Sequence, residues 1–322
     1  MMKQIFDINE VVAFLKSNDN YAILTHQYPD GDTLGSAYAL CGMLQQIGKK
    51  AKVLINGGAL PAKFSYLANG IDTTQFTPQT YISVDVADKK LLGVLDIYAD
   101  NIQMAVDHHE THKPFAQQYY VVAESASNCE NIFDIAKLLD ITFTKDIANA
   151  IYTGMTTDTG CFRYSNVTAR THLIVAQLME YNCDAYKINK QMFETVSKNK
   201  KELEAYVIGN MEYYHNDEVA FAYTTKAILD KFNVGDDQIE GISAIPRTIE
   251  GVKVGITLRE KDSQTFKVSV RTNDGIKANE ICSHFGGGGH NAAAGCAIKG
   301  TIQQVKDLLL PVVYKVLENE VF

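Results

Sequence analysis

An imidazole and two carboxylates stand within seven residues near the start of the chain, at His26, Asp30 and Asp32. A short apolar run, Tyr21–Leu24, precedes them, and a helix is expected over 33–47. Ligands of open α/β sheets bind beyond the carboxyl ends of the strands, and oxygen and nitrogen donors there suit a divalent metal. The segment also suits a plain βα turn, because Pro-Asp-Gly-Asp is good turn chemistry and Asp32 or Thr33 could cap the helix.

Three later segments repeat this arrangement, in which an apolar element ends in an acid or an imidazole. The run 82–84 leads to Asp85, with Asp88 just beyond, the run 102–106 leads to Asp107, His108 and His109, and the predicted helix 147–155 leads to Asp158. A lone strand-end aspartate is usually a cap or turn residue. Adjacent side chains of a strand point to opposite sides, so core packing explains at most one of the two histidines. Four such coincidences indicate one site.

These residues, in this order, resemble the four motifs of the DHH phosphoesterase family. The segment 285–290, followed by 292–295, resembles the glycine-rich signature of the associated C-terminal domain. Within the family the closest resemblance is to the short two-domain enzymes of the nano-RNase A type. Those enzymes trim very short oligonucleotides and dephosphorylate 3′-phosphoadenosine 5′-phosphate. The chain departs from the family at Val86, where a small hydroxyl residue is common, and at His112-Lys113, where a Thr-Asn pair is common.

The resemblance implies two metal ions in each chain. His26 and Asp30 would hold the first ion, Asp32, His108 and Asp158 would hold the second, and Asp85 would bridge both. Two divalent ions about 3.5–4 Å apart neutralise a phosphodiester, activate water and align it for in-line attack. Carboxylate and imidazole ligands without a thiolate suit Mn²⁺, with Mg²⁺ or Co²⁺ as substitutes.

The resemblance also gives the other residues of the third motif roles in catalysis. His109 would contact the phosphoryl oxygens or protonate the leaving oxygen. Asp107 would orient an imidazole by accepting its other N–H, with a strand-end cap as the alternative. His112 is expected in an exposed loop, with a substrate contact as the second option.

Groups outside the metal motifs could bind the phosphate and base of a substrate. The segment 286–290 is expected to be a glycine-rich loop that exposes backbone N–H groups to an anion, and 292–295 after it could open a helix. Arg271 ends a predicted strand and offers bidentate geometry for phosphate. Arg163 with Tyr164 offers charge beside an aromatic face, although a surface arginine beside a core tyrosine explains that pair as well. The predicted substrate contacts are Arg163, Arg271, Gly287, Gly288, Gly289 and His290.

Composition limits the class of protein and of partner. A chain of 322 residues favours two domains, and no apolar run approaches the roughly 20 residues of a membrane span. Six scattered cysteines suit a reducing compartment, so we expect a cytoplasmic protein. The net charge of -8 disfavours a broad grip on long nucleic acid, including long duplex DNA, and favours a short anionic substrate. The oligomeric state stays open, with a homodimer among the options.

The elements that must position these residues follow a two-domain α/β pattern. Over 1–186 the pattern predicts a parallel sheet covered by helices, beginning with a helix in the first 20 residues. The stretch 187–210 is expected to be a helical connector, and 211–322 a smaller α/β domain with a mixed sheet, with a cleft between the two domains. Strands are expected at 21–24, 52–55, 81–84, 104–106, 218–223, 252–258 and 266–271. Further helices are expected at 33–47, 131–139, 145–155, 168–181, 225–232, 277–285 and 302–317, the last with a kink at Pro311.

The sequence thus predicts a metal-dependent phosphodiesterase that hydrolyses short oligonucleotides to mononucleotides. The 3′-phosphate of 3′-phosphoadenosine 5′-phosphate is a further candidate substrate. A hydrolase of linear dinucleotides such as pApA is the nearest alternative, ahead of a manganese pyrophosphatase or exopolyphosphatase. A processive single-strand exonuclease would need more length and basic surface. A non-catalytic nucleotide-binding regulator is disfavoured because all eight motif residues are present.

Overall fold

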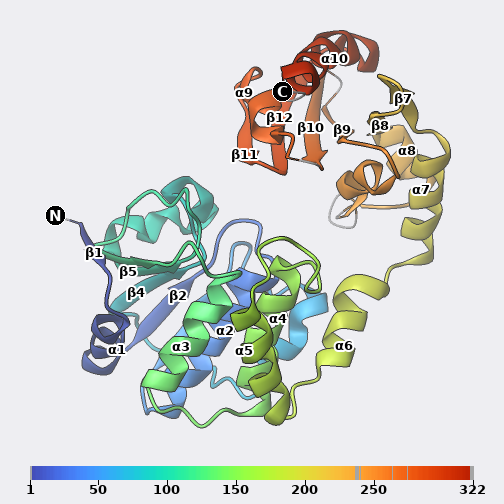
Figure 1. Ribbon diagram of the computed structural model, residues 1–322. Helices are drawn as coiled ribbons and strands as arrows, with labels where there is room; N and C mark the ends of the chain where they lie inside the picture. Colours follow the sequence, from blue (N-terminus) through green and yellow to red (C-terminus); the bar gives the residue numbers. More distant parts are fainter. Residues whose placement is uncertain (1, 236–238, 240, 263, 274, 320–322) are drawn as a thin grey trace. The chain divides into compact units, whose positions relative to one another are not determined.

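Two compact α/β units, Met1–Thr195 and Val196–Phe322, make up the chain, and each contains its own six-stranded sheet (Figure 1). The computed structural model describes residues 2–235, 239, 241–262, 264–273 and 275–319, apart from the side chains of His290 and Asn319. The predicted fold class is confirmed. No helix in these ranges is long and apolar enough to cross a membrane.

The division between the units falls inside the stretch 187–210, whose helical segments pack in both units. Ile188, in α6 (Ala185–Asn189), belongs to the core of the first unit. A π-helical turn, η3 (Lys190–Glu194), follows α6. Leu203 and Val207 of α7 (Lys198–Gly209) pack in the second unit, with Ala222 and Leu229. The two helical segments separate because each buries its apolar side chains in a different core.

The first sheet is parallel throughout and has the strand order β1-β6-β5-β4-β2-β3. All four residues of β2 are buried, as expected for a parallel strand covered on both faces. The strands of this sheet are β1 (Lys3–Ile5), β2 (Tyr21–Leu24), β3 (Ala51–Leu54), β4 (Thr80–Val84), β5 (Ile102–Asp107) and β6 (Gln118–Val121).

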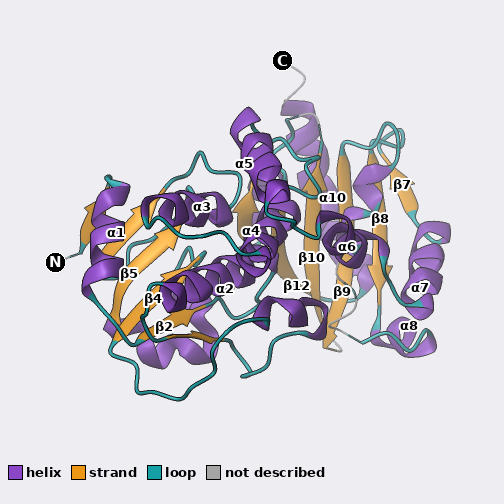
Figure 2. Ribbon diagram, turned by 90° about the horizontal axis from the view of Figure 1, so that it is seen from below, coloured by secondary structure: helices purple, strands orange, loops and turns teal. Residues whose placement is uncertain are grey.

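Separate sets of apolar side chains fill the two faces of this sheet. Ile23, Ile82 and Met104 face a core shared with helices α1 to α4, and Figure 2 shows α1, α2 and α3 across β2, β4 and β5. Ala22 and Ala105 face the other core, which is covered by the 3₁₀ segment η2 (Lys89–Asn101). The remaining elements are η1 (Ala62–Ala68), α1 (Ile8–Ser17), α2 (Gly31–Gln46), α3 (Asn128–Leu138), α4 (Lys145–Asp158) and α5 (Ala169–Glu180).

The predicted strands and helices of this unit are present, with ends shifted by a few residues. Two strands, β1 and β6, were not predicted. The first 20 residues were predicted to form one helix, whereas Lys3–Ile5 is an edge strand paired with β6. A three-residue strand with one buried residue is too short to show the alternation of apolar and polar residues by which a strand is recognised.

The second unit contains a mixed sheet with the order β11-β12-β10-β9-β8-β7, in which β8 and β9 are parallel and the other neighbours antiparallel. Its strands are β7 (Glu212–Tyr214), β8 (Val219–Thr224), β9 (Val254–Asp262), β10 (Thr265–Thr272), β11 (Gly288–His290) and β12 (Ala293–Lys299). Its other helical segments are α8 (Lys226–Lys231), η4 (Ile242–Ala244), η5 (Pro246–Thr248), α9 (Ala278–Ser283) and α10 (Ile302–Asn319), which continues through Pro311.

The sequence suggested that the segment after the glycine run could open a helix. In the structure this segment is the strand β12. Ala294, Cys296 and Ile298 of β12 are buried, while the residues between them are less so, which is the period of a strand with one face on a core. The small side chains reflect close packing beside β11 and β10.

Candidate metal and catalytic site

The four motifs of the first unit meet at the carboxyl edge of its parallel sheet. His26 follows β2, Asp85 follows β4, Asp107 is the last residue of β5, and Asp158 is the last residue of α4. Side chains from these positions form three groups whose candidate ligand atoms lie within 4.8 Å of one another. The groups are His26, Asp30 and Asp85; Asp32, His108 and Asp158; and Asp85, His108 and His109. The edge of the sheet therefore gathers all six predicted metal ligands.

The first group is built on the loop between β2 and α2. His26 Nε2 lies 3.6 Å from Asp30 Oδ1 and 3.9 Å from Asp85 Oδ2. Asp30 Oδ1 also accepts the backbone N–H groups of Asp32 and Thr33, at 3.0 and 3.2 Å. Asp30 is thus the N-cap of α2, in place of the predicted Asp32 or Thr33. The same residue both caps the helix in a βα turn and belongs to a candidate metal group.

The second group surrounds the imidazole of His108. Its Nε2 atom lies 3.3 Å from Asp158 Oδ2, 3.6 Å from Asp32 Oδ2 and 3.5 Å from Asp85 Oδ1. Its Nδ1 atom lies 3.0 Å from the carbonyl oxygen of Ser125. That hydrogen bond places the proton on Nδ1 and leaves Nε2 as a ligand atom toward the carboxylates.

Asp85 belongs to the first group, and its Oδ1 atom also lies 3.5 Å from His108 Nε2 of the second group. Its Oδ2 faces His26, and its buried Oδ1 has no hydrogen-bond partner among the described residues. Its backbone has φ of +57°, which is costly for a residue other than glycine and is typical of functional sites. Burial raises the pKa of Asp85 well above its usual range, and the nearby carboxylates of Asp32 and Asp30 raise it further. A bound cation would relieve both the missing partner and the repulsion, so these residues fit divalent metal ions.

Close packing of α3 and α4 against α2 positions Asp32. Asp32 Oδ2 and Oδ1 accept the backbone N–H groups of Asn128 and Cys129 at the start of α3, at 2.6 and 3.0 Å. A methyl group on Gly154 of α4 would lie 2.5 Å from Asp32 Oδ1 and 2.2 Å from the sulfur of Cys129. Only glycine fits at position 154. Because glycine has no side chain, α4 can approach Asp32 of α2 closely.

A buried carboxylate with two histidine partners lies behind these groups. Asp107 Oδ1 is 2.8 Å from His109 Nδ1, and Asp107 Oδ2 is 2.6 Å from His112 Nδ1. Burial opposes ionisation of Asp107, but the hydrogen bonds from both imidazoles lower its pKa below the usual range. The pKa of His109 is raised above its usual value, because the hydrogen bond to Asp107 and the negative charge of Asp107 outweigh the opposing effect of burial.

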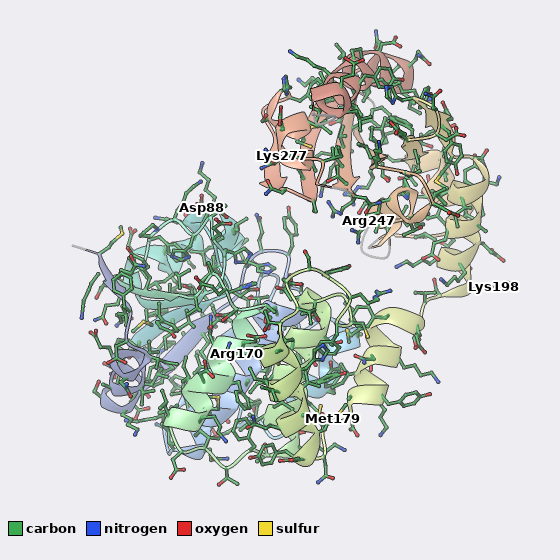
Figure 3. All side chains as sticks on the ribbon, viewed as in Figure 1. Asp88, Arg170, Met179, Lys198, Arg247 and Lys277 are labelled. Atoms are coloured by element: carbon green, nitrogen blue, oxygen red, sulfur yellow. The ribbon has the colours of Figure 1, made fainter. Side chains whose placement is uncertain are left out.

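His112 is a residue whose place the sequence did not reveal. It was expected in an exposed loop, but only 4% of its side chain is exposed, and its ring stacks on Tyr119 at 5.6 Å between centroids. Asp88, by contrast, lies outside the ligand groups. Figure 3 labels its side chain. Asp88 caps η2 by accepting the backbone N–H of Lys90 at 3.0 Å, and it also accepts from Lys113 Nζ at 2.8 Å.

The turn after Asp158 carries the predicted Arg163. Gly160, Cys161 and Phe162 have φ of +56°, +60° and +61°, an unusual run. It is held in place because the backbone N–H groups of Cys161 and Phe162 donate to the carbonyl of Thr156 and the hydroxyl of Thr159. Arg163 is exposed, and its Nε donates to the carbonyl of Gly160 at 2.6 Å. Tyr164 is 45% exposed, so the alternative of a core tyrosine does not describe it.

The other predicted substrate contacts lie in the second unit. Arg271 is half-buried in β10, opposite Gly255 and Ala293. Gly288 and Gly289 are exposed and belong to the edge strand β11 rather than to a loop, and a Cβ on Gly289 would lie 2.6 Å from the carbonyl oxygen of Ala293. Gly287 donates its N–H to the carbonyl of Cys282 at 3.0 Å. The side chain of His290 lies outside the described part of the chain.

Comparisons with known proteins agree with this architecture. Residues 20–155 match the DHH family, N-terminal domain, and residues 216–319 match the DHHA1 domain. The chain is 29% identical to the probable bifunctional oligoribonuclease and PAP phosphatase NrnA of Streptococcus mutans over 287 residues, which cover 88% of this chain and 91% of that one.

Solved structures share the fold. An exopolyphosphatase-related protein from Bacteroides fragilis matches with a TM-score of 0.83 and 26% identity, covering 97% of this chain and 95% of that chain. RecJ from Thermus thermophilus, solved with Mn²⁺, matches in fold with a TM-score of 0.55 and 12% identity, over 96% of this chain and 54% of that chain. The chain is therefore a member of the DHH family, with a DHH domain followed by a DHHA1 domain.

Proposed function

We propose that this protein is a two-metal phosphoesterase that hydrolyses short oligonucleotides to mononucleotides and removes the 3′-phosphate of 3′-phosphoadenosine 5′-phosphate. The observation that carries the proposal is the position of Asp85, which is shared by two groups of candidate ligands at one sheet edge. The similarity to a probable bifunctional oligoribonuclease and PAP phosphatase over most of both chains supports the choice of substrate.

The metal ligands in this proposal are His26, Asp30 and Asp85 for one ion and Asp32, His108, Asp158 and the same Asp85 for the other. Divalent ions bound there would neutralise phosphate charge and supply an activated water at neutral pH. We infer that Mn²⁺ is preferred, at two ions per chain, because all of the ligands are oxygen and nitrogen atoms. The Mn²⁺ in a RecJ neighbour of the same fold is consistent with this choice.

His109 acts on the reacting phosphoryl group in this proposal. Asp107 fixes its Nδ1 atom, so the ring is held in one orientation and Nε2 is the nitrogen directed at a substrate. A histidine stabilised in this way can bind phosphoryl oxygens or give a proton to the leaving oxygen. Asp107 is then a positioning residue that supports the charged imidazole.

Binding of the substrate is assigned to residues of both units. Arg163 and Arg271 would pair with phosphate oxygens, and the backbone of Gly287, Gly288 and Gly289, with His290, would receive a terminal phosphate. The net charge of -8 supports a short substrate, because few additional phosphates would be attracted beyond these contacts. We also infer a cytoplasmic location, in agreement with six free cysteines.

One assay tests the proposal. Purified protein with Mn²⁺ is offered labelled strands of two to 24 nucleotides, phosphoadenosine phosphate, pApA and pyrophosphate in parallel. We expect kcat/KM to be highest at roughly two to five nucleotides and to fall for longer strands, with a weak dependence on salt. Hydrolysis of pyrophosphate alone would contradict the proposal, and a rate that rises up to 24 nucleotides with a steep salt dependence would indicate a long-strand exonuclease.

A further inference from the structure

Tyr28 is an exposed aromatic residue within the loop that carries two candidate metal ligands. It stands between His26 and Asp30, and 79% of its surface is accessible to solvent. Within the described part of the chain its side chain makes no hydrogen bond and no ring contact. Neither the metal groups nor the core of the first unit uses this side chain.

The loop that presents Tyr28 is fixed at both ends. The backbone N–H of Gln27 donates to the carbonyl of Leu91 in η2 at 2.7 Å. Gly93 approaches the same residue so closely that a Cβ on it would lie 2.6 Å from Gln27 Cβ. On the other side, Asp30 caps α2. The ring of Tyr28 is therefore carried on a braced backbone.

The segment that braces the loop is itself anchored. Asn56 donates from Nδ2 to the carbonyl of Leu92 at 3.0 Å and accepts the N–H of Val94 at 2.9 Å. Leu91 and Val94 of η2 are 37% and 69% exposed, so apolar surface continues in the segment that holds the loop. An exposed aromatic ring on the braced loop that carries His26 and Asp30 suits a flat group attached to a phosphate at those ligands.

We propose that Tyr28 stacks on the nucleobase of the nucleotide whose phosphate lies at the metal groups. Stacking of a base on an aromatic side chain contributes about 1–3 kcal/mol and tolerates any base, because every base has a π-face. Tyr28 would thus hold the end nucleotide without selecting its sequence. The inference rests on the proposed function, because it requires a nucleotide substrate.

The composition of the chain provides a direct reporter of this contact. The sequence contains no tryptophan, so Tyr28→Trp introduces a single fluorophore at the proposed subsite. Phe6→Trp is the matched control, because Phe6 is 81% exposed and follows β1, four strands from β2 in the sheet order. That separation is roughly 19 Å at about 4.8 Å per strand.

The binding experiment uses AMP and ribose 5-phosphate, which share the phosphate and differ in the base, with Mg²⁺ present. We expect AMP to quench the fluorescence of the Tyr28→Trp variant, ribose 5-phosphate to leave it unchanged, and the Phe6→Trp variant to respond to neither. Unchanged fluorescence of Tyr28→Trp at AMP concentrations that inhibit the same variant would overturn the proposal.

The kinetic experiment compares an adenine dinucleotide with an abasic dinucleotide of the same charge. Tyr28→Ala should raise KM for the adenine substrate about 5- to 150-fold, which is the stacking free energy expressed as a ratio, and change kcat little. Tyr28→Phe should have the wild-type KM for the adenine substrate. Neither substitution should change KM for the abasic substrate. Equal KM values for wild type and Tyr28→Ala on the adenine substrate contradict stacking while leaving the proposed function intact. Failure of the wild-type protein to cleave any oligonucleotide contradicts the proposed function itself.

Discussion

His112 Nδ1 lies 2.6 Å from Oδ2 of Asp107, so this buried carboxylate is held between His112 on one oxygen and His109 on the other. The ring of His112 also packs between Phe115 and Tyr119. Each oxygen of Asp107 has a specific imidazole donor. His112 therefore helps to hold the carboxylate that orients His109, although His112 belongs to none of the candidate metal groups.

His112→Ala should lower both stability and kcat. The change leaves a buried carboxylate oxygen without its donor, which costs about 1–3 kcal/mol, and allows Asp107 to turn away from His109. His112→Asn retains a donor and should cost less. His284→Ala is the control, because His284 is exposed in the second unit. Thermal unfolding and steady-state kinetics measure the two effects, and a His112→Ala protein with wild-type kcat would show that Asp107 needs only one imidazole.

Gly154→Ala should disturb the second metal group through steric contact alone. The added methyl would meet the sulfur of Cys129 at 2.2 Å and Asp32 Oδ1 at 2.5 Å, so either α4 or the acid must move. Gly209→Ala is the matched helical control, because its methyl would meet nothing within 4 Å. We expect Gly154→Ala to lose metal and melting temperature and Gly209→Ala to be neutral or up to about 1 kcal/mol more stable. Equal melting temperatures and metal contents would contradict the packing argument.

Arg271→Ala should weaken substrate capture more than it slows the chemical step. Loss of a charge-assisted hydrogen bond of about 1.5–3 kcal/mol corresponds to a KM raised roughly 10- to 150-fold, with a smaller change in kcat. Lys267→Ala is the control, since Lys267 is an exposed cation on the same strand. If the Arg271 variant binds and turns over short oligonucleotides like the wild type, the substrate-binding role of the second unit is wrong.

Activity removed by a chelator should return best with Mn²⁺, because the candidate ligands combine carboxylate oxygens with imidazole nitrogens. Mg²⁺ and Co²⁺ should restore less, and Zn²⁺ can be included as a competitor for the same ligands. The measurement is the initial rate after dialysis and addition of each ion, with bound metal determined in parallel. Full activity in protein shown to be free of metal would exclude the proposed chemistry.

The sequence predicted the strands that carry the metal motifs because buried parallel strands are short apolar runs, and their ends must meet at one edge. Asp85 and His108 could be placed together on that ground alone. The burial of His112 could not be predicted, because it depends on contacts with Asp107 and with Tyr119 of β6, a strand that was not predicted. The glycine run was taken for a loop because Gly288 and Gly289 have no side chains to show strand alternation, although they pair with β12.

The most direct test of the account is the metal content of the Asp85→Ala variant, compared with the wild type and with Asp88→Ala. Asp85 belongs to the group with His26 and Asp30 and to the group with His108 and His109, whereas Asp88 lies three residues on and caps η2. Elemental analysis after loading with Mn²⁺ should give two ions per chain for the wild type and for Asp88→Ala. It should give far fewer for Asp85→Ala, together with loss of oligonucleotide hydrolysis and an unchanged circular dichroism spectrum. Two bound ions and near-normal hydrolysis in the Asp85→Ala protein would contradict the assignment of Asp85 as the bridge between two metals.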